Sequence, residues 1–214
     1  YNQAVDNYMD EKLSAKKKPN DKGYKKGKHY TGKEHSWDEA FGYFGAAAHG
    51  LTLTAKQNYE VAKLGKKSKS PEAALKLADY NNDGVVDLYR EMNYAHAYYA
   101  SAYDKKGKTS YYKDIVQGFI DGRKLITSAD GEKLSNEQRN KLRAIAADIE
   151  SNWEKVIAES VFKYAGSVYK DLEKLNTIIE AKGNTDKVFR KYGKHWGELK
   201  GFSMALQALS LIHI

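Results

Sequence analysis

Alternating oxygen-bearing side chains mark the segment from Asp79 to Glu91 as a candidate metal site. It reads Asp79-Tyr-Asn81-Asn-Asp83-Gly84-Val85-Val86-Asp87-Leu-Tyr-Arg90-Glu91. Asp or Asn occupies loop positions 1, 3, 5 and 9, glycine position 6 and an aliphatic residue position 8, as in the first nine positions of an EF-hand loop. Calcium takes about 6–8 oxygen ligands, and alternate residues of a tight turn aim their oxygens inward. We therefore predict a calcium ion held by four of these side chains and the Val85 carbonyl.

The end of this segment departs from the EF-hand pattern. Position 12, where a bidentate glutamate is expected, is Arg90, and Glu91 follows one residue later. Glu91 completes the site if the exit helix starts differently, or Asp87 coordinates the ion directly; either way we expect lowered affinity. The alternative is an Asx-rich turn without a metal. Because no second paired loop is visible, a structural clip is favoured over a sensor.

A second predicted metal site combines two short patterns from different helices. Its candidate ligands are His35, Asp38, Glu39, His195 and Glu198. His35 and Glu39 are four residues apart and His195 and Glu198 three, so each pair shares one helix face. Two such pairs can hold a transition metal such as iron or zinc inside a helical bundle. The alternative is that they are polar pairs that close hydrogen bonds between helices.

Catalytic signatures are missing from the sequence. There is no His-Glu-x-x-His zinc-protease motif, no Gly-x-Ser-x-Gly nucleophile elbow and no glycine-rich phosphate loop. We therefore favour a binding protein over an enzyme. A metal-dependent hydrolase with Glu39 or Glu198 as general base remains the alternative.

The charge of the 214-residue chain is strongly basic, with a net charge of +8 from 31 Lys and 5 Arg against 28 acidic residues. Nine of the lysines lie between Lys12 and Lys33, so residues 16–33 are predicted to form a solvated basic loop. The alternative is a surface for an acidic partner or anionic polymer, which would make the protein a structural surface module. Scarce arginine and the lack of a recognised module argue against nucleic acid.

The amino-acid composition limits which folds and which cellular locations are expected. The chain has no cysteine, which excludes disulfides, and only 2 Pro, which suits long helices. No apolar run approaches the roughly 20 residues that span a bilayer. The chain opens at Tyr1 inside a helical pattern, so we expect that an upstream signal segment has been removed.

Hydrophobic periodicity predicts helices almost throughout, and no strand. A capping box of Ser135 and Gln138 starts a helical pattern that continues to Lys182, with a break or bend expected near Gly166. The result is a single all-α domain, an up-and-down helical bundle spanning residues 1–214. The other expected helices are Tyr1–Ala15, Glu34–Gly50, Ala55–Leu64, Pro71–Ala78, Leu88–Tyr103, Tyr111–Thr127 and Thr185–Leu209.

Several strings resemble the bacterial family known as domain of unknown function 4856, which is similar to the imelysin-like (iron-regulated, peptidase M75-like) proteins. They include Trp37-Asp-Glu-Ala-Phe-Gly-Tyr-Phe-Gly45, the loop after Asp79 and His195-Trp-Gly-Glu-Leu-Lys-Gly-Phe202. The resemblance covers residues 1 to about 207. It implies an exported helical protein, a periplasmic or outer-membrane surface lipoprotein whose lipid anchor lies outside this chain, which binds a metal ion or metal-bearing ligand for uptake.

Two departures from the family pattern weaken parts of that resemblance. The Gly-x-His-x-x-Glu motif of the supposed peptidases is imperfect, since Gly32 precedes His35 by three residues and Asp38 takes the place of the acid. The tail Leu209-Ser-Leu-Ile-His-Ile214 is typical of translated sequencing-adapter read-through. We therefore expect a truncated C-terminus and assign no function to His213.

Overall fold

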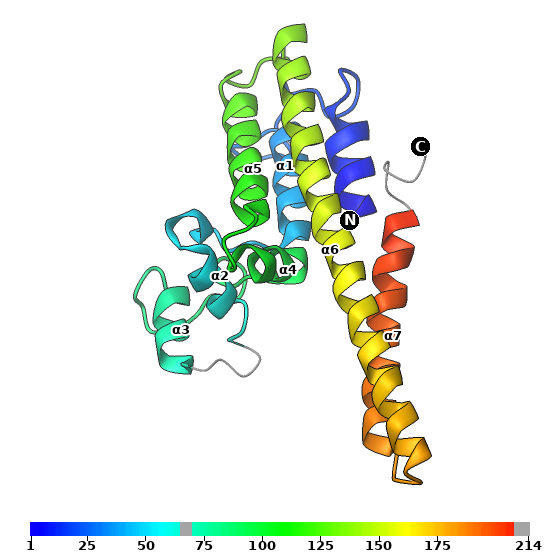
Figure 1. Cartoon of the computed structure of the whole chain (residues 1–214). Coiled ribbons are helices and arrows are strands. Elements are labelled where there is room, and N and C mark those ends of the chain that lie inside the picture. Colours follow the sequence, from blue (N-terminus) through cyan, green and yellow to red (C-terminus); the bar gives the residue numbers. More distant parts are fainter. Residues whose placement is uncertain (65–69, 208–214) are drawn as a thin grey trace. The chain divides into compact units, whose positions relative to one another are not determined.

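The computed structural model describes residues 1–64 and 70–207, and within these ranges it is an all-α helical bundle, as predicted (Figure 1). No β-strand occurs in the described ranges, which hold one isolated antiparallel bridge between Gly23 and Thr31. No helix in the described part is long and apolar enough to cross a membrane. The main helices are α1 (Gly32–Phe44), α2 (Ala55–Val61), α3 (Pro71–Ala78), α4 (Ala95–Asp104), α5 (Tyr111–Thr127), α6 (Asn136–Glu180) and α7 (Asp186–Gln207).

The chain divides into two compact units, unit 1 (Tyr1–Trp153) and unit 2 (Glu154–Ile214), where the sequence predicts one domain. The helix α6 runs through the boundary between them. Unit 1 holds α1 to α5 and the first part of α6, and unit 2 holds the rest of α6 and α7. Unit 1 carries the loop Asp79–Glu91 and the α1 half of the second predicted site, and unit 2 carries the α7 half.

Aromatic side chains form the core of unit 1, where α1 packs against α5. Trp37 is buried and its indole N–H donates to the Phe119 carbonyl at 2.7 Å. A Cβ on Gly122 would lie 2.1 Å from the Trp37 ring, so glycine is needed for α5 to approach this indole. Phe44 and Trp153 pack edge to face with ring centroids 5.1 Å apart. These contacts hold α1, which carries half of the second predicted site.

The N-terminal segment differs from its predicted α-helix. Instead of one helix over Tyr1–Ala15, the chain forms the π-helix η1 (Gln3–Asp10) and the 3₁₀ turn η2 (Glu11–Leu13). The helix expected to end at Gly50 ends at Phe44, because Gly45 takes the left-handed conformation (φ 82°) that closes it. A separate 3₁₀ turn, η3 (Gly50–Thr52), follows.

The expected break near Gly166 is wrong, because α6 is continuous from Asn136 to Glu180. A Cβ at Gly166 would meet nothing within 4 Å, so no neighbouring atom requires glycine at this position. The predicted capping box is confirmed: the Ser135 N–H donates to Gln138 Oε1 at 2.9 Å and the Gln138 N–H to Ser135 Oγ at 3.1 Å. The last helix is described only to Gln207, so the predicted end at Leu209 and the tail beyond it lie outside the described residues.

One lysine of the predicted basic loop is not solvated. Lys33 belongs to α1 and is buried, and its ammonium donates to the Lys12 carbonyl at 2.8 Å and to the Ser14 carbonyl at 3.4 Å. Burial, with the nearby Arg139 and Arg143 charges, lowers the pKa of Lys33 to about 8. The other lysines between positions 12 and 28 are mostly exposed, as predicted, while Lys33 fastens the base of the loop to α1.

Candidate metal site in the loop Asp79–Glu91

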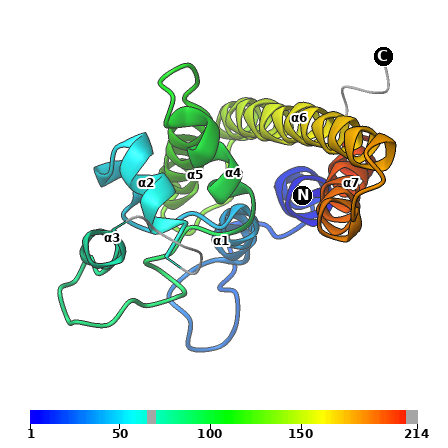
Figure 2. The same cartoon turned by 60° about the horizontal axis from the view of Figure 1, so that its bottom comes forward.

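The candidate calcium loop lies between α3 and α4 as an irregular segment (Figure 2). The helix α3 ends at Ala78, as predicted, but the helix expected from Leu88 begins only at Ala95. The backbone from Arg90 to Tyr94 bonds elsewhere: the Ala48 N–H donates to the Arg90 carbonyl and the Tyr94 N–H to the Gly45 carbonyl, both at 2.7 Å. Pairing with the end of α1 therefore replaces the first two turns of the expected helix.

Side-chain oxygens at the start of the loop accept hydrogen bonds from its own backbone. The two carboxylate oxygens of Asp79 accept from the Asp83 N–H at 3.1 Å and the Gly84 N–H at 3.0 Å. Asp83 Oδ1 accepts from the Val85 N–H at 2.8 Å, and Asn81 Oδ1 from the Asp83 N–H at 3.0 Å. Gly84 adopts φ +85°, which only glycine takes without strain, so the turn needs it. The chain thus folds tightly around the carboxylate of Asp79.

Glu91 joins the two ends of the loop. One of its carboxylate oxygens accepts from the Tyr80 N–H at 3.0 Å and the Asn81 N–H at 3.3 Å, and the other from the Asp87 N–H at 2.8 Å. The residue is only 5% exposed, and among the described residues no lysine, arginine or histidine pairs with it. A single turn after Asp87, closed by the Glu91 N–H on the Asp87 carbonyl at 2.8 Å, brings it inward.

Aliphatic and aromatic neighbours attach the loop to unit 1. Val86 packs against the buried cluster of Val61, Ala78 and Met92, as predicted, while Val85 is exposed. His49, to which the sequence assigned no role, stacks on Tyr80 with ring centroids 5.0 Å apart. Its Nε2–H donates to the Leu77 carbonyl at 3.0 Å, which fixes the ring against the end of α3.

The donor set fits a calcium ion in kind and number. Four carboxylates, one amide oxygen and the Val85 carbonyl fall within 13 residues, and all are hard oxygen ligands. A carboxylate has about four lone-pair sites, so oxygens bonded to N–H groups still have lone pairs for a cation. In the present geometry no three His, Asp or Glu side chains of the described residues converge into a metal-holding group, so an ion would draw these oxygens together.

In the α1 half of the second predicted site, His35 and Asp38 have different partners. His35 Nε2 lies 3.3 Å from Glu39 Oε1, so the predicted pair forms, and the His35 ring packs at a tilt against Tyr24, with ring centroids 3.6 Å apart. Asp38 instead accepts from Arg123 Nε at 2.9 Å. Burial raises the pKa of Asp38, and Arg123 opposes that rise.

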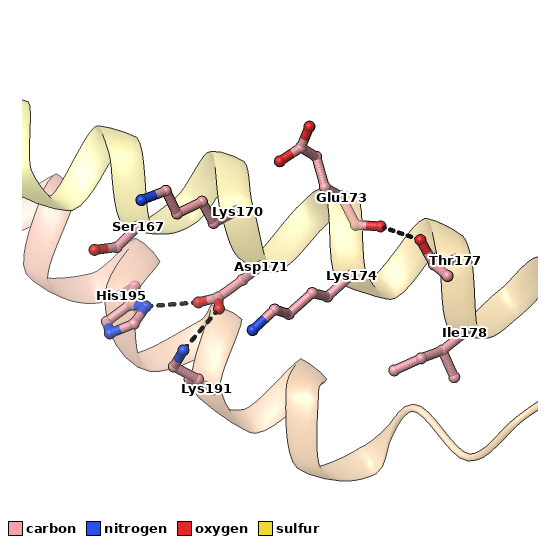
Figure 3. A pocket seen from close by; sticks show the side chains of 9 residues that line it. All are labelled: Ser167, Lys170, Asp171, Glu173, Lys174, Thr177, Ile178, Lys191 and His195. Carbon is pink, nitrogen blue, oxygen red and sulfur yellow. Dashed lines mark hydrogen bonds and ion pairs between the residues drawn. The ribbon is translucent and has the colours of Figure 1, made fainter.

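The α7 half pairs with a residue that sequence analysis missed. His195 bonds through Nδ1 to Asp171 Oδ2 at 2.5 Å, and Lys191 Nζ lies 3.2 Å from Asp171 Oδ1 (Figure 3). The acid that pairs with His195 is therefore Asp171, in the place predicted for Glu198. One feature of the sequence could have revealed Asp171: it is a charged residue that follows Tyr164 and Val168 at helical spacing, in an otherwise apolar stripe.

Asp171 is a buried acid neutralised by its neighbours. It is 1% exposed and lies at the seam of α6 and α7. Burial raises its pKa, but hydrogen bonds and charges from His195 and Lys191 outweigh that effect and lower the pKa below its usual value. His35 and His195 belong to different units, and each has its closest polar partner within its own unit.

No protein-family model, curated protein or solved structure matches the chain. The function of the site therefore follows from its own geometry and chemistry.

Proposed function

We propose that this protein binds calcium in the loop Asp79–Glu91 and that the ion clips this loop to unit 1. The observation that carries the proposal is Glu91: a buried carboxylate, without an ion pair in the described residues, that joins both ends of an oxygen-rich loop. Burying a charge without a counter-ion is costly, and a divalent cation among the loop carboxylates removes that cost.

Charge repulsion within the loop supports the same proposal. Asp79, Asp83, Asp87 and Glu91 place four negative charges in 13 residues, and the nearest paired cation is Arg90, whose Nε lies 3.8 Å from Asp87 Oδ2. Arg90 is largely exposed, so solvent screens this contact and it offsets little of the repulsion. A cation that contacts several carboxylates at once lowers the energy of the folded loop.

We expect affinity in the range of extracellular calcium modules, with a Kd of about 10⁻⁴–10⁻³ M, because position 12 lacks its glutamate. An affinity of this order suits a compartment with abundant calcium, in keeping with the export implied by the family resemblance. The proposed role is therefore structural: a clip that is filled outside the cytoplasm.

Isothermal titration of the full chain with calcium, with magnesium as comparison, tests this proposal. We expect one calcium site, loss of binding in Asp79→Ala, and unchanged binding in Asp130→Asn, which removes a carboxylate charge from an exposed residue of a different loop. Thermal melting should show stabilisation by calcium that a chelator reverses. Absence of calcium binding at millimolar concentrations, or equal binding by Asp79→Ala, would overturn the proposal.

The transition-metal role implied by the resemblance is a separate proposal. It is supported by the imidazoles of His35 and His195, each held beside a carboxylate, which is how proteins orient metal-binding histidines. Zinc or iron binding that disappears in the His35→Ala/His195→Ala double variant, but persists in Asp79→Ala, would support it. Transition-metal binding that is unchanged in the double variant would exclude these ligands.

A further inference from the structure

The helix α6 carries two parallel stripes within unit 2, one covered and one exposed. The covered stripe contains Tyr164, Val168, Asp171 and Leu175, all buried, and faces α7. The exposed stripe starts at the half-buried Ala158 and continues in a strict alternation of four- and three-residue steps through the exposed residues Phe162, Ala165, Tyr169, Leu172, Asn176 and Ile179. This 3.5-residue spacing is typical of the seam along which one helix packs against another.

The exposed stripe is apolar at every position but one. Phe162 is 79% exposed, Tyr169 63% and Ile179 62%, which is unusual for side chains of this size. The exception, Asn176, stands between Leu172 and Ile179, where coiled coils place single polar residues that select the register. A helix with two apolar seams packs against two neighbours in a bundle, and within unit 2 α7 occupies one of them.

The helix α7 extends this surface. Its contacts Tyr164–Phe202 and Asp171–His195 show that it runs antiparallel to α6, as Figures 1 and 2 also show. Phe189 and Trp196 are seven residues apart and exposed, and lie about 100° round the helix from its seam with α6. The exposed stripe of α6 is displaced from its own seam by a similar angle in the same sense, so in an antiparallel pair both sets face one side of the hairpin.

We propose that this face, defined as the exposed α6 stripe with Phe189 and Trp196, is a dimer interface that pairs with the same face of a second copy of this chain. The size of the face fits such a partner. The large apolar side chains of the face expose roughly 700 Å² per copy, close to the roughly 800 Å² that each partner of a stable complex buries. A two-fold axis sets one hairpin on another and makes a four-helix bundle.

Sedimentation equilibrium of the full chain tests the proposal. We expect a dimer, and we expect Tyr169→Glu/Leu172→Glu to weaken dimerisation by roughly a hundredfold or more, because charges would be buried at the interface centre. The matched control is Gly166→Glu/Thr177→Glu, which adds the same charges to exposed positions of α6 away from the stripe and should remain dimeric. Both variants should keep wild-type helicity by circular dichroism, since all four positions are exposed.

A second variant tests the interface by strengthening the dimer instead of disrupting it. Asn176→Leu makes the stripe fully apolar, so the dimer should become tighter by about tenfold. A wild-type chain that stays monomeric at the highest concentration reached, or a stripe variant that dimerises like the control, would overturn the proposal. So would association solely with a different protein, because the second copy would not be the occupant.

Discussion

The loop Asp79–Glu91 in unit 1 and the Asp171 cluster in unit 2 hold their acids in opposite ways. In the loop, carboxylates accept from backbone N–H groups, and the buried Glu91 has no ion pair among the described residues. At the α6–α7 seam, the buried Asp171 is shared by the side chains of Lys191 and His195. A carboxylate that is already bonded to a lysine ammonium and an imidazole has little to gain from a metal, whereas one held only by backbone dipoles has much.

The largest effect should come from removing the paired acid. Asp171→Ala leaves His195 and Lys191 without their shared acceptor, and we expect a loss of about 2 kcal/mol in the free energy of unfolding. The value is below that of a fully buried pair because Lys191 is half-exposed. Urea denaturation followed by circular dichroism measures it, with the exposed α6 residue Glu159→Ala as control. Equal stability of the two variants would show that the cluster contributes nothing.

The loop should respond to charge in a calcium-dependent way. Glu91→Gln keeps one acceptor oxygen for the backbone but removes the charge, so we expect it to cost about 1.5 kcal/mol more in calcium than in chelator. Thermal or urea unfolding of the variant and wild type under both conditions gives this difference. If the cost is the same with and without calcium, Glu91 acts through its hydrogen bonds and not through an ion.

A pair of glycine substitutions separates loop geometry from helix preference. Gly84→Ala should cost about 1 kcal/mol, because alanine is strained at φ +85° although a Cβ there meets nothing within 4 Å. Gly166→Ala, in the middle of α6 with equally open space, should instead gain about 0.5–1 kcal/mol. Equilibrium unfolding of both variants checks the opposite signs. A gain in Gly84→Ala would mean that the turn is not held in this conformation.

Acid titration gives the smallest and most specific difference. The folded pKa of Asp171 lies below its unfolded value of about 3.9, so the unfolded chain binds more protons in that window. Its stabilising contribution is present above about pH 4 and declines as the pH falls through the folded value. Urea unfolding at a series of pH values should therefore show a shallower acid limb in Asp171→Asn than in wild type. Parallel curves would assign the acid sensitivity to other carboxylates.

Local signals explain which parts of the fold could be predicted. The bounds Pro71–Ala78 and Tyr111–Thr127 agree with the structure, and so does the Ser135 capping box, because helix starts and amphipathic stripes depend on near neighbours. The helix expected at Leu88 was wrong because the backbone near Tyr94 bonds to Gly45, and this pairing leaves no trace in a short window.

The same difference between local and long-range signals decides which site residues could be predicted. The loop could be recognised because its oxygens and glycine lie in 13 consecutive residues. The partner of His195 could not, because Asp171 lies 24 residues away and only the antiparallel packing of α6 and α7 joins them. Similarly, Asp38 is one residue from Trp37 in a recognised string, but Arg123, which binds it, comes from α5.

The tryptophans give the two units separate optical signals. Trp37 and Trp153 are buried in unit 1, whereas Trp196 in unit 2 is 50% exposed. Emission from the first two should be blue-shifted and shielded from iodide, whereas emission from Trp196 should be red-shifted and quenched by iodide when the chain is a monomer. A single fluorescence experiment can therefore follow the unfolding of each unit in the unmodified chain, and the iodide sensitivity of Trp196 reports directly whether the face around it is covered.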